Sequence, residues 1–446
     1  MTEFILRSRR VVLPEGVGRA ALRIRGRRIA QVLRDGSAGA AGGEIPVTDF
    51  GGSVIMPGLV DTHVHVNEPG RAEWEGFETA TKAAASGGVT TVIDMPVNSI
   101  PPTTTHEAFH AKVQAAAGRI RVDVGFWGGL VPGNAAELAP LRAAGVFGFK
   151  GFLSPSGVSE FREVAEEDLR AAMPRLERGP LLVHAEWPAL LAPMEGSPRA
   201  YASYLASRPR TAENQAVERI VHLCREFRTP VHILHLSSAE ALEALSLARS
   251  EGLPLTAETC PHYLFFAAEE IPEGGTEFKC APPIRERENR ERLWAALGQG
   301  VIGMVVSDHS PSPPELKLKE SGDFSAAWGG ISSLGLTLAA VWTGASERGF
   351  GLADVARWMC AAPARLAGLT AWKGAIAEGL YADLVVWNPE ERWTVDPARL
   401  HQRHKLTPYE GQVLKGVVEA TYLKGERIFE RGVFHSAPRG EILLSP

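Results

Sequence analysis

The sequence predicts an α/β protein: a (β/α)8 TIM barrel with a small β-sandwich domain formed from both chain termini. The middle of the 446-residue chain alternates short apolar runs with helical segments, and both ends carry strand-like runs separated by turns. Alternation of strands and helices is typical of a parallel sheet covered by helices. The length also fits, since a barrel needs roughly 250 residues and the remainder is enough for one smaller domain.

The β-sandwich is predicted from residues 1–55 and 376–446. In the amino-terminal part, short apolar runs between Gly- and Arg-rich turns predict strands at residues 4–6, 21–24 and 29–33. Similar runs in the carboxyl-terminal part lie at residues 382–387, 417–422 and 424–428. Because both ends are strand-like and the middle is not, we expect the two ends to meet in one domain.

The barrel is predicted for residues 56–375. Its eight strands are expected at residues 57–65, 90–95, 122–127, 146–150, 181–184, 231–235, 253–258 and 301–308. Helical segments are expected between them, at residues 76–86, 105–117, 135–144, 166–177, 212–227, 239–250 and 288–297. The first of these helices ends at Gly87-Gly88, a typical helix stop.

The stretch from Pro57 to His65 carries the clearest chemical signal. It reads as a short buried strand with a polar tip that contains His63 and His65. Residues two apart in a strand point to the same face, so both imidazoles face the same way. A rigid strand end with two such imidazoles suits a metal ion. A surface strand with two unrelated histidines is the alternative, and the rest of the chain argues against it.

Other side chains that can bind a metal also lie at the ends of predicted strands. The carboxyl ends of the predicted strands, where barrel active sites lie, carry His63, His65, Lys150, His184, His235 and Asp308. One histidine at a strand end is more often a hydrogen-bonded structural residue. Six such positions at one rim indicate a metal site.

Lys150 is an unusual member of this set, because a protonated lysine is a poor ligand. It lies in an apolar strand between Phe149 and Gly151, where burial disfavours the ammonium form. An amine that takes up CO2 becomes a carbamate, whose oxygens can bridge two cations. The residues alone leave the carboxylation of Lys150 open.

Composition excludes other classes of protein. The net charge of −5 and a pI near 6.3 give no basic stripe, so we expect no nucleic-acid partner. No run approaches the roughly 18 apolar residues of a membrane span, and the amino terminus lacks a secretory signal. Four scattered cysteines suit a reducing compartment. We therefore expect a cytoplasmic protein.

The chain resembles the amidohydrolase superfamily, in particular the cyclic-amide hydrolases that include dihydroorotases, hydantoinases and allantoinases. The resemblance covers nearly the whole chain and rests on the motifs at residues 57–65, 148–150, 184–186, 235–237, 258–264 and 307–309. It implies the split β-sandwich of both termini and a homotetramer.

The resemblance also implies two divalent metal ions. His63, His65 and Asp308 would hold one ion, His184 and His235 would hold the other, and N6-carboxylated Lys150 would bridge them. Zn(II) is the expected metal, and Co(II), Mn(II) or Fe(II) suits the same ligands. Two cations lower the pKa of a shared water and polarise a carbonyl. The family assigns to Asp308 the catalytic proton transfer from that water to the leaving nitrogen.

Departures from the family pattern indicate which ring is opened. Dihydroorotases usually carry an arginine after the paired histidines, which holds the substrate carboxylate, whereas this chain has Asn67 there. The stretches that instead resemble allantoinases are residues 67–77, 98–103, 278–285, 327–331 and 404–411. This resemblance implies hydrolysis of (S)-allantoin to allantoate in purine degradation. The expected substrate contacts are Asn67, Ser154, Cys280 and Ala281.

Two alternatives belong to different classes. A hydantoinase or dihydropyrimidinase would use the same metal ligands and differ in its pocket loops. A non-catalytic assembly protein of the same fold would have lost ligands, and the retention of all six positions argues against it.

Overall fold

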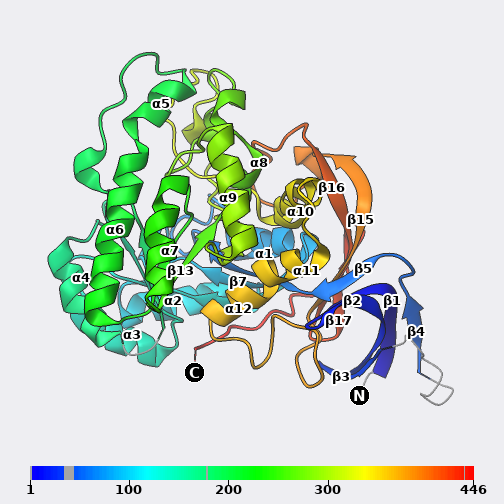
Figure 1. Ribbon diagram of the computed structural model, residues 1–446. Helices are drawn as coiled ribbons and strands as arrows, with labels where there is room; N and C mark the ends of the chain where they lie inside the picture. The colour runs from blue at the N-terminus through cyan, green and yellow to red at the C-terminus, as the bar shows by residue number, and fades with distance from the viewer. Residues whose placement is uncertain (1–2, 35–44, 177–178, 436, 446) are drawn as a thin grey trace.

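The structure is a computed structural model that describes residues 3–34, 45–176, 179–435 and 437–445. Parallel strands covered by helices form the larger part of the molecule (Figure 1), and the strand pairings close them into a ring. A curved sheet beside the ring contains strands from both ends of the chain. The predicted fold class is therefore confirmed.

The curved sheet has nine strands among the residues that the structure describes. The amino-terminal ones are β1 (Glu3–Leu13), β2 (Gly16–Arg25), β3 (Arg28–Leu33), β4 (Val47–Asp49) and β5 (Val54–Pro57), and the carboxyl-terminal ones are β15 (Leu384–Thr394), β16 (Val413–Leu423), β17 (Glu426–Glu430) and β18 (Val433–Phe434). Their order is β18-β17-β16-β15-β5-β1-β2-β3, and β4 pairs with β1. The ends of the chain meet where β15 lies antiparallel to β5, with Val386 opposite Ile55. Both of these residues are fully buried.

The ring is made of β6 (Leu59–Val64), β7 (Val89–Asp94), β8 (Asp123–Phe126), β9 (Gly128–Gly129), β10 (Phe149–Phe152), β11 (Leu181–His184), β12 (Val231–Ile233), β13 (Leu255–Thr259) and β14 (Met304–Val305). Only Trp127 separates β8 from β9, so the two act as one barrel strand. The ring closes where Val64 forms a parallel bridge to His309, and the N–H of His65 donates to the carbonyl of His309 at 2.8 Å.

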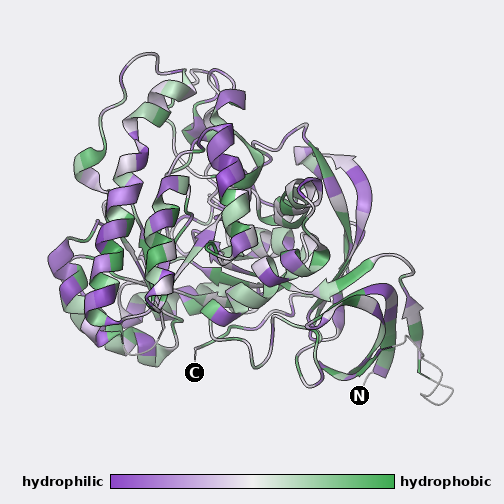
Figure 2. Ribbon diagram, in the orientation of Figure 1, coloured by the Kyte–Doolittle hydropathy of each residue, from purple (hydrophilic) through white to green (hydrophobic). Residues whose placement is uncertain are grey.

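Helices pack on the outside of the ring. Those that follow the predicted segments are α1 (Phe77–Ser86), α2 (His106–Ala116), α3 (Leu138–Ala144), α4 (Glu166–Ala172), α6 (Arg210–Phe227), α7 (Leu242–Ser250) and α9 (Arg287–Gln299). Figure 2 shows hydrophilic and hydrophobic residues side by side along these outer helices. In α6, Val217, Ile220 and Cys224 are buried at helical spacing, which gives the helix one apolar face toward the strands.

In the described part of the chain, five further α-helices were not predicted. They are α5 (Tyr201–Ser207), α8 (Pro261–Phe265), α10 (Thr337–Glu347), α11 (Leu352–Ala356) and α12 (Ala362–Leu366). Helix α10 is buried along residues 337–345, and it contacts both α8 and the strand β16. Within the described ranges, no helix has the length and apolar character needed to cross a bilayer.

A buried ion cluster ties the barrel to the curved sheet. Asp123, at the start of β8, accepts hydrogen bonds from Lys373 at 2.8 Å and from Lys424 at 2.7 Å. Lys373 also pairs with Asp383, next to β15. All four side chains are buried. Such charges are stable inside a protein only when they are paired, so the cluster holds the two parts together.

The chain passes from the curved sheet into the barrel at Gly58. Its N–H donates to the carbonyl of Asp383 at 2.8 Å. A Cβ at this position would lie 2.9 Å from Cβ of Thr90 and closer still to that residue's Oγ1 and Cγ2. The close approach of β6 to β7 therefore requires a residue without a side chain here.

We predict that Gly58→Ala destabilises the protein by about 1–3 kcal/mol, the usual effect of overpacking a core. Chemical denaturation measures this change. Gly18→Ala is the matched control, because a Cβ there meets nothing within 4 Å. Adding Thr90→Ala removes two of the three clashing atoms, so the double variant should recover part of the lost free energy of unfolding. Equal stability of Gly58→Ala and Gly18→Ala would contradict the prediction.

Candidate metal centre

The carboxyl ends of five barrel strands bring the six predicted ligands together. His63 lies in β6 and His65 follows it, Lys150 lies in β10, His184 ends β11, His235 follows β12, and Asp308 follows β14. All six side chains are buried. All except His63 line a cavity of about 500 Å³ that opens above the cluster.

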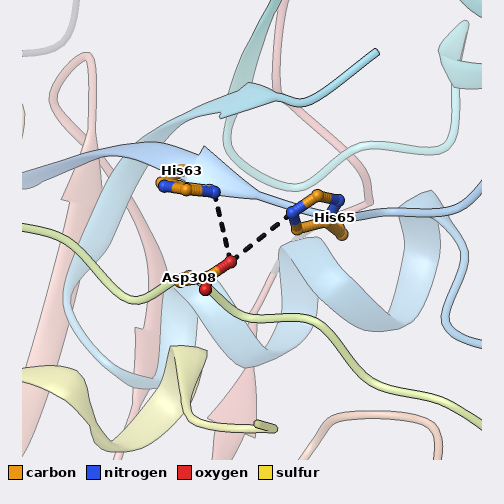
Figure 3. Close-up of side chains that lie close together, drawn as sticks. All are labelled: His63, His65 and Asp308. Atoms are coloured by element: carbon orange, nitrogen blue, oxygen red, sulfur yellow. Dashed lines mark ion pairs between the residues drawn. The ribbon is translucent and has the colours of Figure 1, made fainter. Parts of the chain in front are cut away.

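His63, His65 and Asp308 form the first half of the cluster (Figure 3). Oδ1 of Asp308 lies 3.1 Å from Nε2 of His63 and 3.4 Å from Nε2 of His65. The three ligand atoms lie within 4.8 Å of one another. Two imidazole nitrogens and one carboxylate oxygen that converge in this way suit a divalent cation.

The second half contains His184, His235 and Lys150. Nδ1 of His184 faces Nε2 of His235 at 3.0 Å. Nζ of Lys150 lies 3.5 Å from Nε2 of His63, so this lysine reaches the first half of the cluster. Four imidazoles, a carboxylate and a lysine able to become a carbamate together match the donors expected for a pair of divalent ions.

Burial sets the charge of these groups. Desolvation lowers the pKa of His65 to about 4 and also lowers the pKa of His184 and His235, so the rings are neutral and keep the lone pair that a metal needs. Desolvation also lowers the pKa of Lys150 to about 8, which makes the uncharged amine accessible near neutral pH. The pKa of Asp308 lies well below its ordinary value, because desolvation, which raises it, is outweighed by the attraction of a proton or other positive charge held at the rings of His63, His65 and His235.

Two buried carboxylates contact the outer ring nitrogens of two predicted ligands. Oε2 of Glu186 lies 2.8 Å from Nε2 of His184, and Oε1 of Glu258 lies 2.5 Å from Nδ1 of His63. Arg208 pairs with both oxygens of Glu186, at 3.0 and 2.5 Å. In both histidines, the ring nitrogen that does not contact the carboxylate faces the cluster. The sequence motifs contain both glutamates. The two-residue spacing of His184 and Glu186 is a signal for the first contact, whereas Glu258 is distant from His63 in the sequence and has no such signal.

The predicted substrate contacts divide into two groups. Cys280 and Ala281 line the cavity, together with Arg208 and Trp328. Asn67 and Ser154 are buried and are not among the lining residues. Within the part of the chain that the structure describes, Oδ1 of Asn67 and Oγ of Ser154 have no hydrogen-bond partner.

The backbone is strained at several positions around the cluster. Asn67, Asn98, His235 and Asp308 have positive φ angles of 67°, 73°, 35° and 44°. Each such conformation costs a non-glycine residue about 1–3 kcal/mol and is characteristic of functional sites. His235 and Asp308 both lie just after the strands that precede them, β12 and β14.

We predict that a divalent metal raises the thermal stability of metal-free protein, and that His65→Ala abolishes most of this rise. A cation that binds only the folded state stabilises it by about 2.7 kcal/mol at a concentration a hundredfold above Kd. Differential scanning calorimetry with and without Zn(II) measures the effect. His222 is exposed on α6, so His222→Ala should keep the full rise. An unchanged rise in His65→Ala would place the cation elsewhere.

Comparisons with known proteins agree with this geometry. The amidohydrolase family matches residues 54–186 and 200–428. An allantoinase from Streptomyces avermitilis is 52% identical over 445 residues, which cover 99% of this chain and 98% of that protein. An allantoinase from Arabidopsis thaliana is 43% identical over 98% of this chain and 90% of its own. The solved L-hydantoinase (dihydropyrimidinase) from Arthrobacter aurescens has a TM-score of 0.94 and 30% identity over 100% of both chains. The chain therefore belongs to the amidohydrolase family.

Proposed function

We propose that the protein is a metal-dependent hydrolase that opens the ring of (S)-allantoin to give allantoate in purine degradation. The observation that carries the proposal is the complete set of six ligands buried beneath a cavity of about 500 Å³. Full-length similarity to allantoinases, at 52% and 43% identity, supports the choice of ring.

The proposal assigns two divalent ions to the cluster, with Zn(II) as the first choice. His63, His65 and Asp308 hold one ion, and His184 and His235 hold the other through Nδ1 and Nε2, the atoms that face each other at 3.0 Å. Lys150, carboxylated on Nζ, is shared. Bound there, the ions supply a water of lowered pKa and polarise the ring carbonyl.

Asp308 carries the proton in this proposal. Its carboxyl is ionised and reaches the cavity, and both of its contacts with the paired histidines use Oδ1. Oδ2 therefore remains to accept a proton from the attacking water. Returning that proton to the ring nitrogen as the amide bond breaks makes the nitrogen a good leaving group.

Among residues that the structure describes, two basic side chains line the cavity besides Lys150. Lys279 donates to the carbonyls of Ser325 and Ala327, and Arg208 is paired within the protein, which suits an uncharged ring. Arg208 reaches the cavity, but Glu186 neutralises it through both oxygens, so it offers no free charge to a substrate carboxylate. We propose Asn67, Ser154, Cys280 and Ala281 as substrate contacts. The unpaired oxygens that Asn67 and Ser154 show among the described residues support the first two assignments.

We further propose that the protein is a cytoplasmic homotetramer. The resemblance to cyclic-amide hydrolases supports the tetramer. The four cysteines, all within the described ranges, are buried free thiols, which supports a reducing compartment. Sedimentation equilibrium tests the tetramer.

Turnover of four rings, measured in parallel, tests the proposed reaction. Metal-loaded protein with bicarbonate present is given allantoin, hydantoin, dihydrouracil and dihydroorotate. A strong preference for allantoin is expected. Preference for hydantoin or dihydrouracil would favour the alternative, a hydantoinase or dihydropyrimidinase with the same metal ligands. No turnover of any ring by metal-loaded protein would refute the proposal.

Lys150→Ala should lower activity by more than about 100-fold, which exceeds the effect of changing residues outside the ligand set. The variant loses the group shared between the ions, so metal content should fall with activity. Lys150→Arg is the matched control, since it keeps a long cationic side chain that cannot become a carbamate. It should be as inactive as Lys150→Ala, and full turnover in either variant would refute the shared ligand.

Trp328→Ala should raise KM by about tenfold, the equivalent of about 1.4 kcal/mol of lost apolar contact, with a small effect on kcat. Trp328 lines the cavity and packs edge-on against Trp74 at 5.1 Å between ring centroids. Nζ of Lys317 donates to the carbonyl of Trp328 at 3.0 Å. Steady-state kinetics measure the split, and Trp328→Phe should keep most of the affinity. A fall in kcat at constant KM would assign the residue a different role.

A further inference from the structure

A chain of side-chain hydrogen bonds crosses the barrel core and ends at the buried His63. Oγ1 of Thr256 lies 2.7 Å from Nδ1 of His232, and Nε2 of His232 lies 2.9 Å from Oε2 of Glu258. The other oxygen of Glu258 contacts Nδ1 of His63 at 2.5 Å. The side chains of His232, Glu258 and His63 are 0% exposed.

The far end of this chain reaches the opposite face of the barrel. Thr256 is exposed and borders a separate cavity of about 630 Å³. Its lining includes Pro180, Pro230, Pro254 and Gly303, each of which directly precedes one of the strands β11 to β14. Since the metal cluster lies where the strands end, the chain spans the barrel from one face to the other.

Each polar atom along the chain is used. His232 and Thr256 are neighbours in the register of β12 and β13, which brings the imidazole to the hydroxyl. Oε1 of Glu258 accepts a second hydrogen bond from the N–H of His235 at 3.3 Å. Buried polar networks are rigid when they are fully satisfied. One carboxylate thus contacts the ring of one predicted ligand and the backbone of another.

The contacts also define which ring nitrogen carries hydrogen. A carboxylate only accepts, so His63 donates through Nδ1, and its Nε2 carries the lone pair that faces Asp308. His232 likewise donates to Glu258 through Nε2. Its Nδ1 is then an acceptor for the hydroxyl of Thr256. Every tautomer in the chain follows from the position of Glu258.

We propose that Glu258 and His232 are positioning residues of the metal centre, which hold the ring of His63 in the tautomer and orientation that present Nε2 to a cation. Thr256 anchors the far end of the chain. The inference rests on the metal centre of the proposed function and does not depend on which ring is opened. Partners of this kind change metal affinity by about 10- to 100-fold when they are substituted.

Metal affinity measured without substrate tests the inference. Metal-free wild type, Glu258→Gln, Glu258→Ala and Thr256→Val are titrated with Co(II) in competition with a chelator, below the unfolding temperature of every variant. Glu258→Ala should bind about 10- to 100-fold more weakly. Glu258→Gln keeps an oxygen that can accept from Nδ1 of His63, so it should lose less Co(II) affinity. Thr256→Val should lose the least affinity of the three variants. The visible absorption of bound Co(II) should shift in the two Glu258 variants.

Asp123→Asn is the matched control for a purely structural effect. Asp123 is a buried carboxylate of the ion cluster and pairs with lysines instead of metal ligands. Asp123→Asn should lower the melting temperature and leave the affinity for Co(II) and the absorption of bound Co(II) unchanged. Wild-type affinity in Glu258→Ala, or an equal loss in Asp123→Asn, would overturn the inference. A wild type that binds no Co(II) would refute the metal centre itself, whereas one that binds Co(II) but opens no ring would refute only the reaction.

Discussion

The bridge between Val64 and His309 closes the barrel, and the metal cluster depends on this closure. The first strand supplies His63 and His65, and the segment after the last strand supplies Asp308. Asp61 reinforces the seam, since its carboxylate accepts the N–H of Ser307 and the N–H of His63, each at 3.1 Å. The same contacts therefore close the ring and align the first three ligands.

The support for the ligands is divided between two environments. Glu186 holds His184 and is itself held by Arg208, which reaches the cavity. Glu258 holds His63 from inside the barrel core, away from solvent. The first support therefore includes a residue that lines the cavity, whereas the second does not. The cluster thus has one side that faces the cavity and one side built into the core.

Sequence patterns predicted the elements that have a clear periodicity. Alternation of apolar runs and amphipathic helices gave the barrel, and strand-like runs at both ends gave the curved sheet. Helix α10 was missed because its sequence is apolar on nearly every side, which removes the helical pattern. The last strand was predicted at residues 301–308, but only Met304 and Val305 keep strand geometry. The chain then turns to reach the positive φ of Asp308.

The structure brings together all six side chains that the sequence placed at strand ends. The two-residue spacing within one strand was enough to predict that His63 and His65 face the same way, because the direction of side chains along a strand is a local property. Glu186 lies two residues after His184, so the same local spacing could have indicated it. The contacts of Arg208 with Glu186 and of Glu258 with His63 join distant parts of the chain, which spacing along the chain does not encode. The same limit applies to the loops around the cavity. Loop conformation decides whether residues such as Asn67 and Ser154 reach the cavity surface.

The split construction of the curved sheet imposes an order on biosynthesis. β5 is made early, but its neighbour β15 begins only at Leu384, after the ribosome has translated the entire barrel. Until then, Val54, Ile55 and Met56, which are fully buried in the finished fold, form an open strand edge. Open apolar edges pair readily with other chains. Premature termination anywhere in the barrel would therefore release a nascent chain prone to aggregation, even where the barrel residues already made could fold.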